Sequence, residues 1–516
     1  MTVYVIVFIL YFLFMIVTAL ASAKQVESMT DFTTGGHKMG LVLGVGTSLA
    51  TWLSVASVMG VPGNLYSRGV AALIGWVAGW FLATALMPLI AYKIRLPEMP
   101  TRTFPEFMRL RYEPFATTSS LQLLVAFIML VGYFIFSYIQ VQGFGIVFST
   151  VTGIPYEYAV FFFLLILIFT CMGGFMSVAA TDTVNAILIF IGVVMAAFTV
   201  LNLTGGFANI MSTINTTTAP TFEGGAPIEA GILGTPLGTF GFSALTSIFL
   251  SNSLGASVAP HWIARFMAPK NAKAAALQMT LTLFCLVGIF IPLVTIGLGA
   301  KTIIPSLPQG KTTDYLFPMV IMEYCHPLVG ALALTAICAA AVSTANSMLL
   351  HCSTSLVYDI KRQFNKGVQT EEDNNKTTKQ LRIVIFSMGV LSVLCAVRPF
   401  TLLAMGFTYV YGTFGAAFFW PVILGITWKR MNRAGAYASI IAGMIGFIYA
   451  TATASTIPAF LVGAGLSLTA CLIAVFATPA PSLEAYESFF VLNISDSTRK
   501  VIHTIQKEID ETGTAH

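Results

Sequence analysis

The stretch that decides the fold is residues 251–261, which read SNSLGASVAPH. It places hydroxyl and amide side chains, a glycine and a proline at the end of an apolar run. Residues 44–63, GVGTSLATWLSVASVMGVPG, interrupt an earlier apolar run in the same way. Glycine and proline both weaken a continuous helix, so each stretch predicts a helix that breaks near its middle.

The composition shows what surrounds these two stretches. Hydrophobic residues make up 57% of the 516 residues and charged residues only 9%, whereas a soluble domain has roughly 25% charged residues. This small number of charged residues cannot cover the surface of a soluble protein of this length. The chain must therefore face lipid. The net charge of +5 does not indicate a nucleic-acid partner, because membrane proteins collect Lys and Arg in cytoplasmic loops.

Apolar runs long enough to cross the hydrocarbon core, which takes about 20 residues, occur about thirteen times. Backbone groups cannot stay unpaired in lipid, so these runs predict an all-α polytopic membrane protein. The runs lie near residues 2–22, 40–67, 70–94, 118–149, 156–172, 180–204, 237–258, 274–300, 327–357, 381–397, 400–426, 434–454 and 456–478.

The positive charges predict how these spans are oriented. With the N-terminus outside and the C-terminus in the cytoplasm, all but four of the 26 Lys and Arg residues fall on the inner side, Arg265 among them. The four outer cations are Arg68, Lys301, Lys311 and Arg398. We therefore expect a multi-pass protein of the plasma membrane. A cleavable signal peptide ending at residues 21–23 is the alternative, but the first four residues carry no Lys or Arg.

The two interrupted runs are five spans apart. Broken helices at matching places of two halves are typical of inverted-repeat transporters, whose site lies at the membrane midplane. The alternative is that small residues merely let helices pack closely. The predicted parts are an extra helix and inner loop at 1–38, five-helix repeats at 39–204 and 237–426 with an outer loop at 205–236 between them, two further helices at 427–478 and a cytoplasmic tail at 479–516.

The ninth run contains a stripe of oxygen-bearing positions. Ala340, Ser343, Thr344 and Ser347 follow the spacing i, i+3, i+4 and i+7, which places them on one helix face. Hydroxyls and freed carbonyls are oxygen ligands that suit a hard monovalent cation. The alternative is that the hydroxyls bond back to carbonyls of their own helix.

Other ionisable and reactive side chains are few in the apolar runs. Asp182 is an isolated acid near the start of the sixth run, where it predicts either a cation ligand or an N-cap. His261 follows the proline of the seventh run, and His351 is interpreted as a packing residue. The seven cysteines include no C-x-x-C pair, which favours packing over a redox or zinc role. No catalytic constellation is visible, so an enzyme is not expected.

Seven motifs between about residues 33 and 443 resemble those of the sodium/solute symporter family, in its proline and pantothenate transporter branch. They appear in the family's order, which makes the set specific although each motif alone is weak. They read GGHKMG at 35–40, MGVPG at 59–63, TFPEF at 103–107, PHWIARFMA at 260–268, AVST at 341–344, GTFGAAF at 412–418 and WKRMNRAGA at 428–436. The resemblance implies a LeuT-like five-plus-five inverted repeat that works by alternating access.

The resemblance also implies binding residues. The family's sodium site corresponds to the backbone carbonyls of Ala50, Leu53 and Ala340 with the hydroxyls of Ser343 and Thr344. Some relatives hold another sodium ion at positions that correspond to Asp182, Ser343, Asn346 and Ser347. The positions expected to line the solute pocket are Trp52, Ser54, Ser57, Tyr138, Gln140, Asn252 and His261.

Two pocket positions depart from the proline carriers. Trp52 replaces an Asp of those carriers, and Asn252 replaces a Trp. With no Lys or Arg expected in the pocket, an anion would rely on helix N-termini and hydroxyls. We therefore expect Na⁺-coupled symport of a small carboxylate, pantothenate-like or a monocarboxylate. The alternatives are a sodium/proline or other amino-acid symporter, a transporter-like membrane sensor, and a channel.

Overall fold

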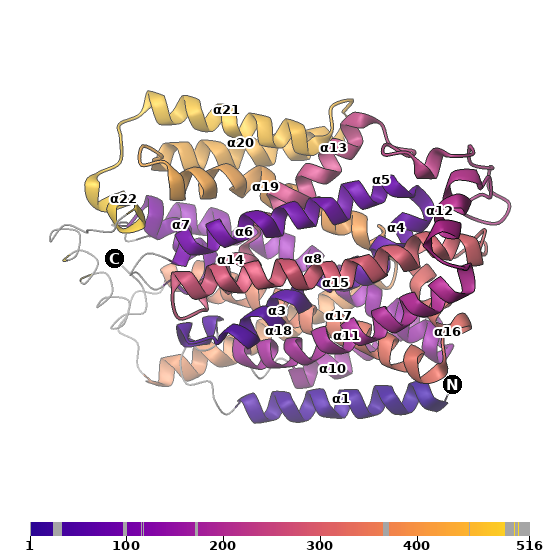
Figure 1. Ribbon diagram of the computed structural model, residues 1–516. Helices are drawn as coiled ribbons and strands as arrows, with labels where there is room; N and C mark the ends of the chain where they lie inside the picture. The colour runs from indigo at the N-terminus through magenta and orange to yellow at the C-terminus, as the bar shows by residue number, and fades with distance from the viewer. Residues whose placement is uncertain are drawn as a thin grey trace.

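The computed structural model describes residues 2–23, 33–95, 101–114, 116, 118–170, 174–364, 371–453, 455–490, 500 and 504. Within these ranges the chain is helical, and the only β-type pairings are two isolated bridges, Met39 with Pro269 and Phe222 with Leu307. Most of the long helices run side by side along one direction (Figure 1). The prediction of an all-α bundle is confirmed.

The helices follow the predicted apolar runs closely. In chain order, those labelled α are α1 Thr2–Ala23, α3 Leu41–Trp52, α4 Val61–Arg68, α5 Val70–Ala72, α6 Gly79–Arg95, α7 Phe104–Tyr112, α8 Ser120–Thr152, α9 Tyr156–Ala159, α10 Phe162–Thr170, α11 Gly174–Thr204, α12 Phe207–Thr216, α13 Phe242–Leu250, α14 Pro260–Met267, α15 Ala272–Ile303, α16 Leu316–Tyr324, α17 Pro327–Thr354, α18 Glu371–Ala396, α19 Leu403–Thr427, α20 Arg433–Ala452, α21 Ala459–Ala477 and α22 Leu483–Phe490.

Ten helices in the described ranges are long and apolar enough to cross a membrane, and the bent pair of α3 and residues 56–68 adds an eleventh. The remaining two predicted spans correspond to shorter apolar helices, Val3–Val17 and Tyr156–Leu165. A membrane protein with about ten spans is therefore confirmed. The full count of thirteen and the orientation of the termini stay predictions.

The helices at the centre of the bundle are buried, whereas those at its edges are more exposed. The most apolar window of the span that begins with α17 is 83% buried, whereas that of α21 is 28% buried. Helix α17 packs against α8 and α11 in the middle of the bundle, while α1 and the α20–α21 pair lie at opposite edges (Figure 1). Polar residues near the middle of α17 are therefore shielded from both water and lipid.

The first broken helix bends by 50° between α3 and the segment Ala56–Arg68. Leu53 ends α3 with φ −89° and ψ 52°, outside helical geometry. The chain then resumes as a π-helical turn, η2 Ala56–Gly60, which leads directly into α4. The predicted interruption at residues 44–63 is confirmed, and it lies at residues 53–55.

The second broken helix has the same parts, but its π-helical turn comes before the break and not after it. Helix α13 leads into a π-helical turn, η5 Ser251–Gly255, and the chain breaks at Ala259, which is extended with φ −60° and ψ 133°. Pro260 explains the break, because a proline disfavours a helical residue before it and is well suited to begin a new helix. The predicted interruption at residues 251–261 is confirmed.

One predicted boundary is wrong at this helix. The seventh run was expected to end near residue 258 with Arg265 in an inner loop, but α14 continues the span to Met267. Arg265 is 1% exposed. The physical reason is that Pro260 restarts the helix, so the motif after it is a buried half-helix.

Candidate functional site

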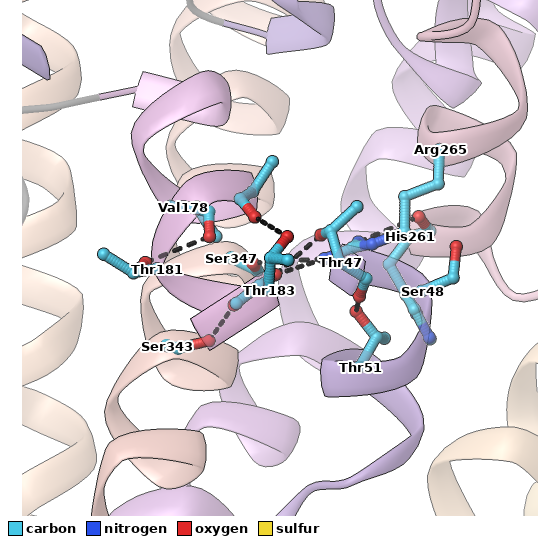
Figure 2. A network of polar contacts seen from close by, with 12 residues as sticks. Thr47, Ser48, Thr51, Val178, Thr181, Thr183, His261, Arg265, Ser343 and Ser347 are labelled. Carbon is cyan, nitrogen blue, oxygen red and sulfur yellow. Dashed lines mark hydrogen bonds and ion pairs between the residues drawn. The ribbon is translucent and has the colours of Figure 1, made fainter. Parts of the chain in front are cut away.

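Four helices bring polar side chains together in the buried centre. Thr47 comes from α3, Asp182 from α11, Arg265 from α14, and Ser343 and Ser347 from α17; these five residues are called the polar cluster below. Figure 2 shows side chains from these helices converging on one place. All five side chains are at least nine-tenths buried.

Asp182 is the centre of the polar cluster. Thr47 Oγ1 donates a hydrogen bond to Asp182 Oδ2 at 2.6 Å, and Ser343 Oγ donates one to Oδ1. Asp182 lies in the third turn of α11, which begins at Gly174. The N-cap interpretation of this acid is therefore wrong, because the helix begins two turns earlier than the apolar run did. The carboxylate instead joins α3, α11 and α17.

Arg265 is the counter-charge of Asp182. Its Nη2 lies 3.6 Å from Asp182 Oδ2 and 3.4 Å from Ser347 Oγ, and its Nη1 donates to the carbonyl of His261 at 3.2 Å. A buried charge is costly unless it is paired and hydrogen-bonded, so this pair holds both side chains in place. Arg265 therefore belongs to the buried polar cluster, whereas the absence of Lys and Arg from the solute pocket stays a prediction.

The break in α3 leaves main-chain oxygens available. Leu53 N bonds to Leu49 O, and the next backbone bonds run from Ser57 N and Val58 N to Ser54 O. In this described stretch, no backbone N–H donates to the carbonyls of Ala50 or Leu53. Helix α3 packs against α17. The carbonyls expected to bind sodium are therefore freed on a helix that packs against α17, the helix that carries the predicted hydroxyls.

The predicted stripe of oxygen-bearing positions on α17 is buried, and its residues differ in their hydrogen bonding. Thr344 is 3% exposed, and its Oγ1 is buried with no hydrogen-bond partner among the described residues. Ser343 instead donates to Asp182, and Ala340 is 0% exposed. An unpaired buried hydroxyl is costly, so Thr344 is the stripe residue that most needs a ligand. The back-bonding alternative does not describe Ser343.

The second predicted sodium set is assembled only in part. Asp182 and Ser343 are hydrogen-bonded to each other, and Ser347 reaches the same carboxylate through Arg265. Asn346 is 7% exposed on the same helix. The guanidinium thus provides a positive charge beside the carboxylate where the resemblance implied a cation.

Two tryptophan rings lie close to Trp52, the first of the positions predicted to line the solute pocket. The ring of Trp52 lies 4.9 Å from the ring of Trp262 and 5.8 Å from that of Trp80, measured between centroids. Trp52 is 3% exposed, and its Nε1 has no partner within the described part of the chain. Trp52 therefore lies between the two broken helices and presents one free donor.

Asn252, in η5, is bound by a chain of polar contacts. Its Oδ1 accepts a hydrogen bond from Trp80 Nε1 at 2.9 Å, and its Nδ2 donates to Thr408 Oγ1 at 3.2 Å and to Ile248 O at 2.9 Å. Trp76 Nε1 donates to the same Thr408 hydroxyl at 3.0 Å. Asn252 thus lies beside the Trp52 cluster, and its amide already has protein partners.

Gln140 and His261 carry polar atoms that lack partners. Gln140 is 0% exposed, and neither its Oε1 nor its Nε2 is hydrogen-bonded among the described residues. His261 Nδ1 lies 3.2 Å from Tyr133 OH, whereas its Nε2 has no partner in the same part of the chain. Buried groups of this kind normally find a partner, which makes both residues candidates for contact with a solute.

The remaining solute positions are placed differently. Tyr138 OH accepts a hydrogen bond from Phe400 N at 3.0 Å, and its ring stacks on that of Phe400 at 4.7 Å, near the start of α19. Ser57 Oγ donates to the carbonyls of Trp52 and Ser54 and so stabilises the break itself. Ser54 is 2% exposed at the break. His351 stacks on Tyr133 at 5.2 Å, as a packing residue would.

Sequence reasoning missed Arg265, Thr47, Trp80 and Thr408 as members of the site. Thr47 lies in the hydroxylated stretch at residues 44–63, which was the available signal. Arg265 follows Pro260 by five residues, which places it on the half-helix that the proline begins. Trp80 and Thr408 lie in ordinary apolar runs, where nothing local marks them.

The geometry of two broken helices around buried oxygens defines a LeuT-like secondary transporter, and the comparisons with known proteins give its family. The sodium:solute symporter family profile matches residues 32–443. The chain belongs to the sodium:solute symporter family.

Characterised relatives cover most of the chain. The chain is 24% identical to the osmoregulated proline transporter OpuE of Bacillus subtilis, over 94% of this chain and 96% of that protein. It is 25% identical to the sodium/pantothenate symporter of Escherichia coli, over 82% and 84%. It is 24% identical to a sodium/proline symporter of Staphylococcus aureus, over 84% and 83%. These relatives are transporters and not enzymes.

Solved structures confirm the fold. A sodium-coupled sialic acid symporter in a substrate-bound outward-open state superposes with a TM-score of 0.75 at 20% identity, over 93% of this chain and 99% of that one. The nucleobase-cation-symport-1 family transporter MHP1 superposes with a TM-score of 0.58 at 13% identity, over 91% and 98%.

Proposed function

We propose that the protein couples the inward flow of Na⁺ to the uptake of a small carboxylate. Two observations support this most directly: the carbonyls of Ala50 and Leu53 are open at the helix break, and the buried hydroxyl of Thr344 has no partner among the described residues. With the carbonyl of Ala340 and the hydroxyl of Ser343, these groups form an uncharged oxygen set for a monovalent cation.

The ion and the solute act on neighbouring parts of one broken helix. Ala50 and Leu53 flank Trp52, so a cation at their carbonyls fixes the backbone that positions the indole. Coupling requires that each ligand stabilises the conformation that the other binds. The membrane potential contributes about 2.3 kcal/mol per charge for every 100 mV, which drives the ion inward together with the solute.

The solute class is inferred from the groups around Trp52. Trp52 and Gln140 are uncharged and have N–H donors without a partner among the described residues, which suit a carboxylate. Proline and pantothenate, the solutes named for the relatives, both carry a carboxylate group. An amino acid is the alternative solute. Its ammonium group would need a carboxylate partner, and Trp52 occupies the position where the proline carriers have an Asp.

Purified protein in liposomes tests the proposal. Uptake of radiolabelled pantothenate, proline and lactate is measured with an inward Na⁺ gradient, with an equal K⁺ gradient, and with the Na⁺ gradient collapsed. We expect accumulation of a carboxylate above the outside concentration only with the Na⁺ gradient. Equal uptake under all three conditions would contradict sodium coupling. Passive equilibration without accumulation would indicate a channel.

Replacing Thr344 with Ala is expected to weaken sodium activation of uptake by about 10- to 100-fold, because a hydrogen bond or ligand to a charged group contributes about 1.5–3 kcal/mol. The apparent solute affinity should fall with it through linkage. Uptake rates are measured across Na⁺ concentrations. Thr335→Ala is the matched control, since that buried hydroxyl lies on the same helix about two turns away. An unchanged Na⁺ dependence in Thr344→Ala would remove this site.

Replacing Gln140 or Asn252 with Ala is expected to weaken solute binding about fivefold, the value of one hydrogen bond. Sodium binding without solute should change little. Equilibrium binding of the labelled solute and thermal unfolding are measured on each variant. Gln140→Ala should leave the unfolding temperature unchanged, because its amide makes no internal hydrogen bond among the described residues. A lower unfolding temperature with intact solute binding would mean that both residues only join helices.

A further inference from the structure

The end of the bundle near α4, α12 and α16 (Figure 1) contains a cavity of about 560 Å³. We call it the vestibule. Its lining includes Asn64, Ser67 and Arg68 of α4, Phe240 and Lys311 of the connecting loops, and Met405 of α19. The charge distribution predicts that this end of the bundle faces outside, where a solute arrives.

The vestibule is positively charged. Arg68 and Lys311 line it, and no Asp or Glu is among its described lining residues. These two are half of the four cations predicted for this side of the membrane. No described residue forms an ion pair with either one. Two positive charges that line a cavity without an ion-pair partner attract anions and raise their local concentration.

Aromatic rings and a hydroxyl hold the two cations in place. Arg68 Nη1 donates to Thr239 Oγ1 at 2.7 Å, and its guanidinium lies 5.0 Å from the centre of the Phe240 ring. Lys311 Nζ lies 4.3 Å from the centre of the Tyr315 ring. Each cation keeps further N–H donors, because Arg has five and Lys has three. The donors are therefore positioned and still available to a ligand.

A short chain of contacts connects the vestibule with the predicted solute position. Met405 lines the vestibule, and Thr408 follows one turn later on α19. Thr408 Oγ1 accepts hydrogen bonds from Trp76 Nε1 at 3.0 Å and from Asn252 Nδ2 at 3.2 Å. The ring of Trp76 also lies 6.1 Å from that of Phe240 in the vestibule wall. One layer of side chains thus separates the cavity from Asn252.

We propose that the vestibule is an entry site that binds the solute's carboxylate through Arg68 and Lys311 before the solute reaches the Trp52 and Asn252 region. This inference rests on the proposed uptake of a carboxylate. The site is open to solvent, so its contacts are screened and its affinity is low. Its effect is to speed the capture of anions over zwitterions.

A cysteine at position 67 tests the site without transport. Ser67 is half-buried, lines the vestibule, and is replaced by Cys with little change in size. The rates at which Ser67→Cys reacts with an anionic and a cationic methanethiosulfonate are compared, with the parent protein giving the background from exposed Cys285 and Cys395. Arg68→Gln with Lys311→Gln is expected to lower the anionic-to-cationic rate ratio about tenfold. Arg398→Gln, an exposed cation outside the cavity, should not change it.

Protection by ligands identifies what binds. We expect millimolar pantothenate, without Na⁺, to slow the reaction of Ser67→Cys, and proline to slow it far less. The protection should vanish in Arg68→Gln with Lys311→Gln. A changed rate ratio without protection by pantothenate, or equal protection by proline, would overturn the entry site. Failure of the proposed function is seen separately, as absence of Na⁺-driven accumulation in liposomes while protection at position 67 persists.

Discussion

Replacing Asp182 with Asn is expected to abolish Na⁺-driven uptake and to destabilise the protein by about 3–5 kcal/mol, the cost of breaking a buried ion pair. The change removes the negative charge 3.6 Å from Arg265 Nη2 and leaves the guanidinium buried without a counter-charge. It also weakens the acceptor that Thr47 and Ser343 share. Uptake in liposomes and thermal unfolding of the purified protein measure the two effects.

A double variant separates the two roles of Asp182. Adding Arg265→Gln to Asp182→Asn removes both charges and should restore much of the lost stability. If Asp182 also binds a sodium ion, Na⁺ activation should remain impaired in the stable double variant. Recovery of normal Na⁺ activation would show that Asp182 only pairs with Arg265. Asp359→Asn is the matched control, since Asp359 is a buried carboxylate bonded to Thr103 and Gln122, away from the polar cluster.

Replacing Trp52 with Asp is expected to shift selectivity at least about tenfold from pantothenate toward proline. A carboxylate at this position repels an anionic solute and attracts the ammonium group of an amino acid, and each 1.4 kcal/mol of such a difference is tenfold. Trp52 lies between Trp80 and Trp262 and is 3% exposed, so the new charge would be poorly solvated without a ligand. Competition between the two labelled solutes in liposomes measures the shift.

Trp52→Phe is the control for this shift. It keeps an uncharged aromatic ring against Trp262 while it removes the free Nε1 donor and part of the ring, so the order of preference should be retained. An alternative role for Trp52 is helix packing alone. In that case Trp52→Asp would lower the unfolding temperature and reduce uptake of both solutes equally, which would contradict a solute contact.

Local chemistry predicted the interruptions and the stripe on α17. Pro260 prevents a continuous helix wherever it occurs, and the hydroxyl spacing at Ser343 and Thr344 is a property of one helix. The role of each hydroxyl could not be predicted in the same way. Ser343 bonds to Asp182 while Thr344 has no partner in the described part of the chain, a difference that depends on the position of α11.

The contacts of the predicted solute residues depend on segments that are distant in the sequence. The sequence alone could therefore not predict which of these residues have protein partners. Tyr138 and Gln140 are two residues apart on α8, yet Tyr138 bonds to Phe400 while Gln140 has no partner among the described residues. The start of α11 differs from the predicted one because the glycines at 173–174 and the polar residues Thr181 and Asp182 favour a boundary there when the sequence is considered alone. The charge of Arg265 favours a loop when the sequence is considered alone, because its counter-charge, Asp182, lies 83 positions earlier in the chain.

The π-helical turns η2 and η5 have a consequence for how the two broken helices are compared with their relatives. A π turn contains about one residue more than an α turn, which displaces everything after it by about 100° around the helix axis. A helical wheel drawn from Phe242 through Ser251–Gly255 therefore assigns later residues to the wrong face. Aligning a relative that has an ordinary α turn here requires a one-residue gap. Without that gap, the functional positions after the turn would be transferred to their neighbours.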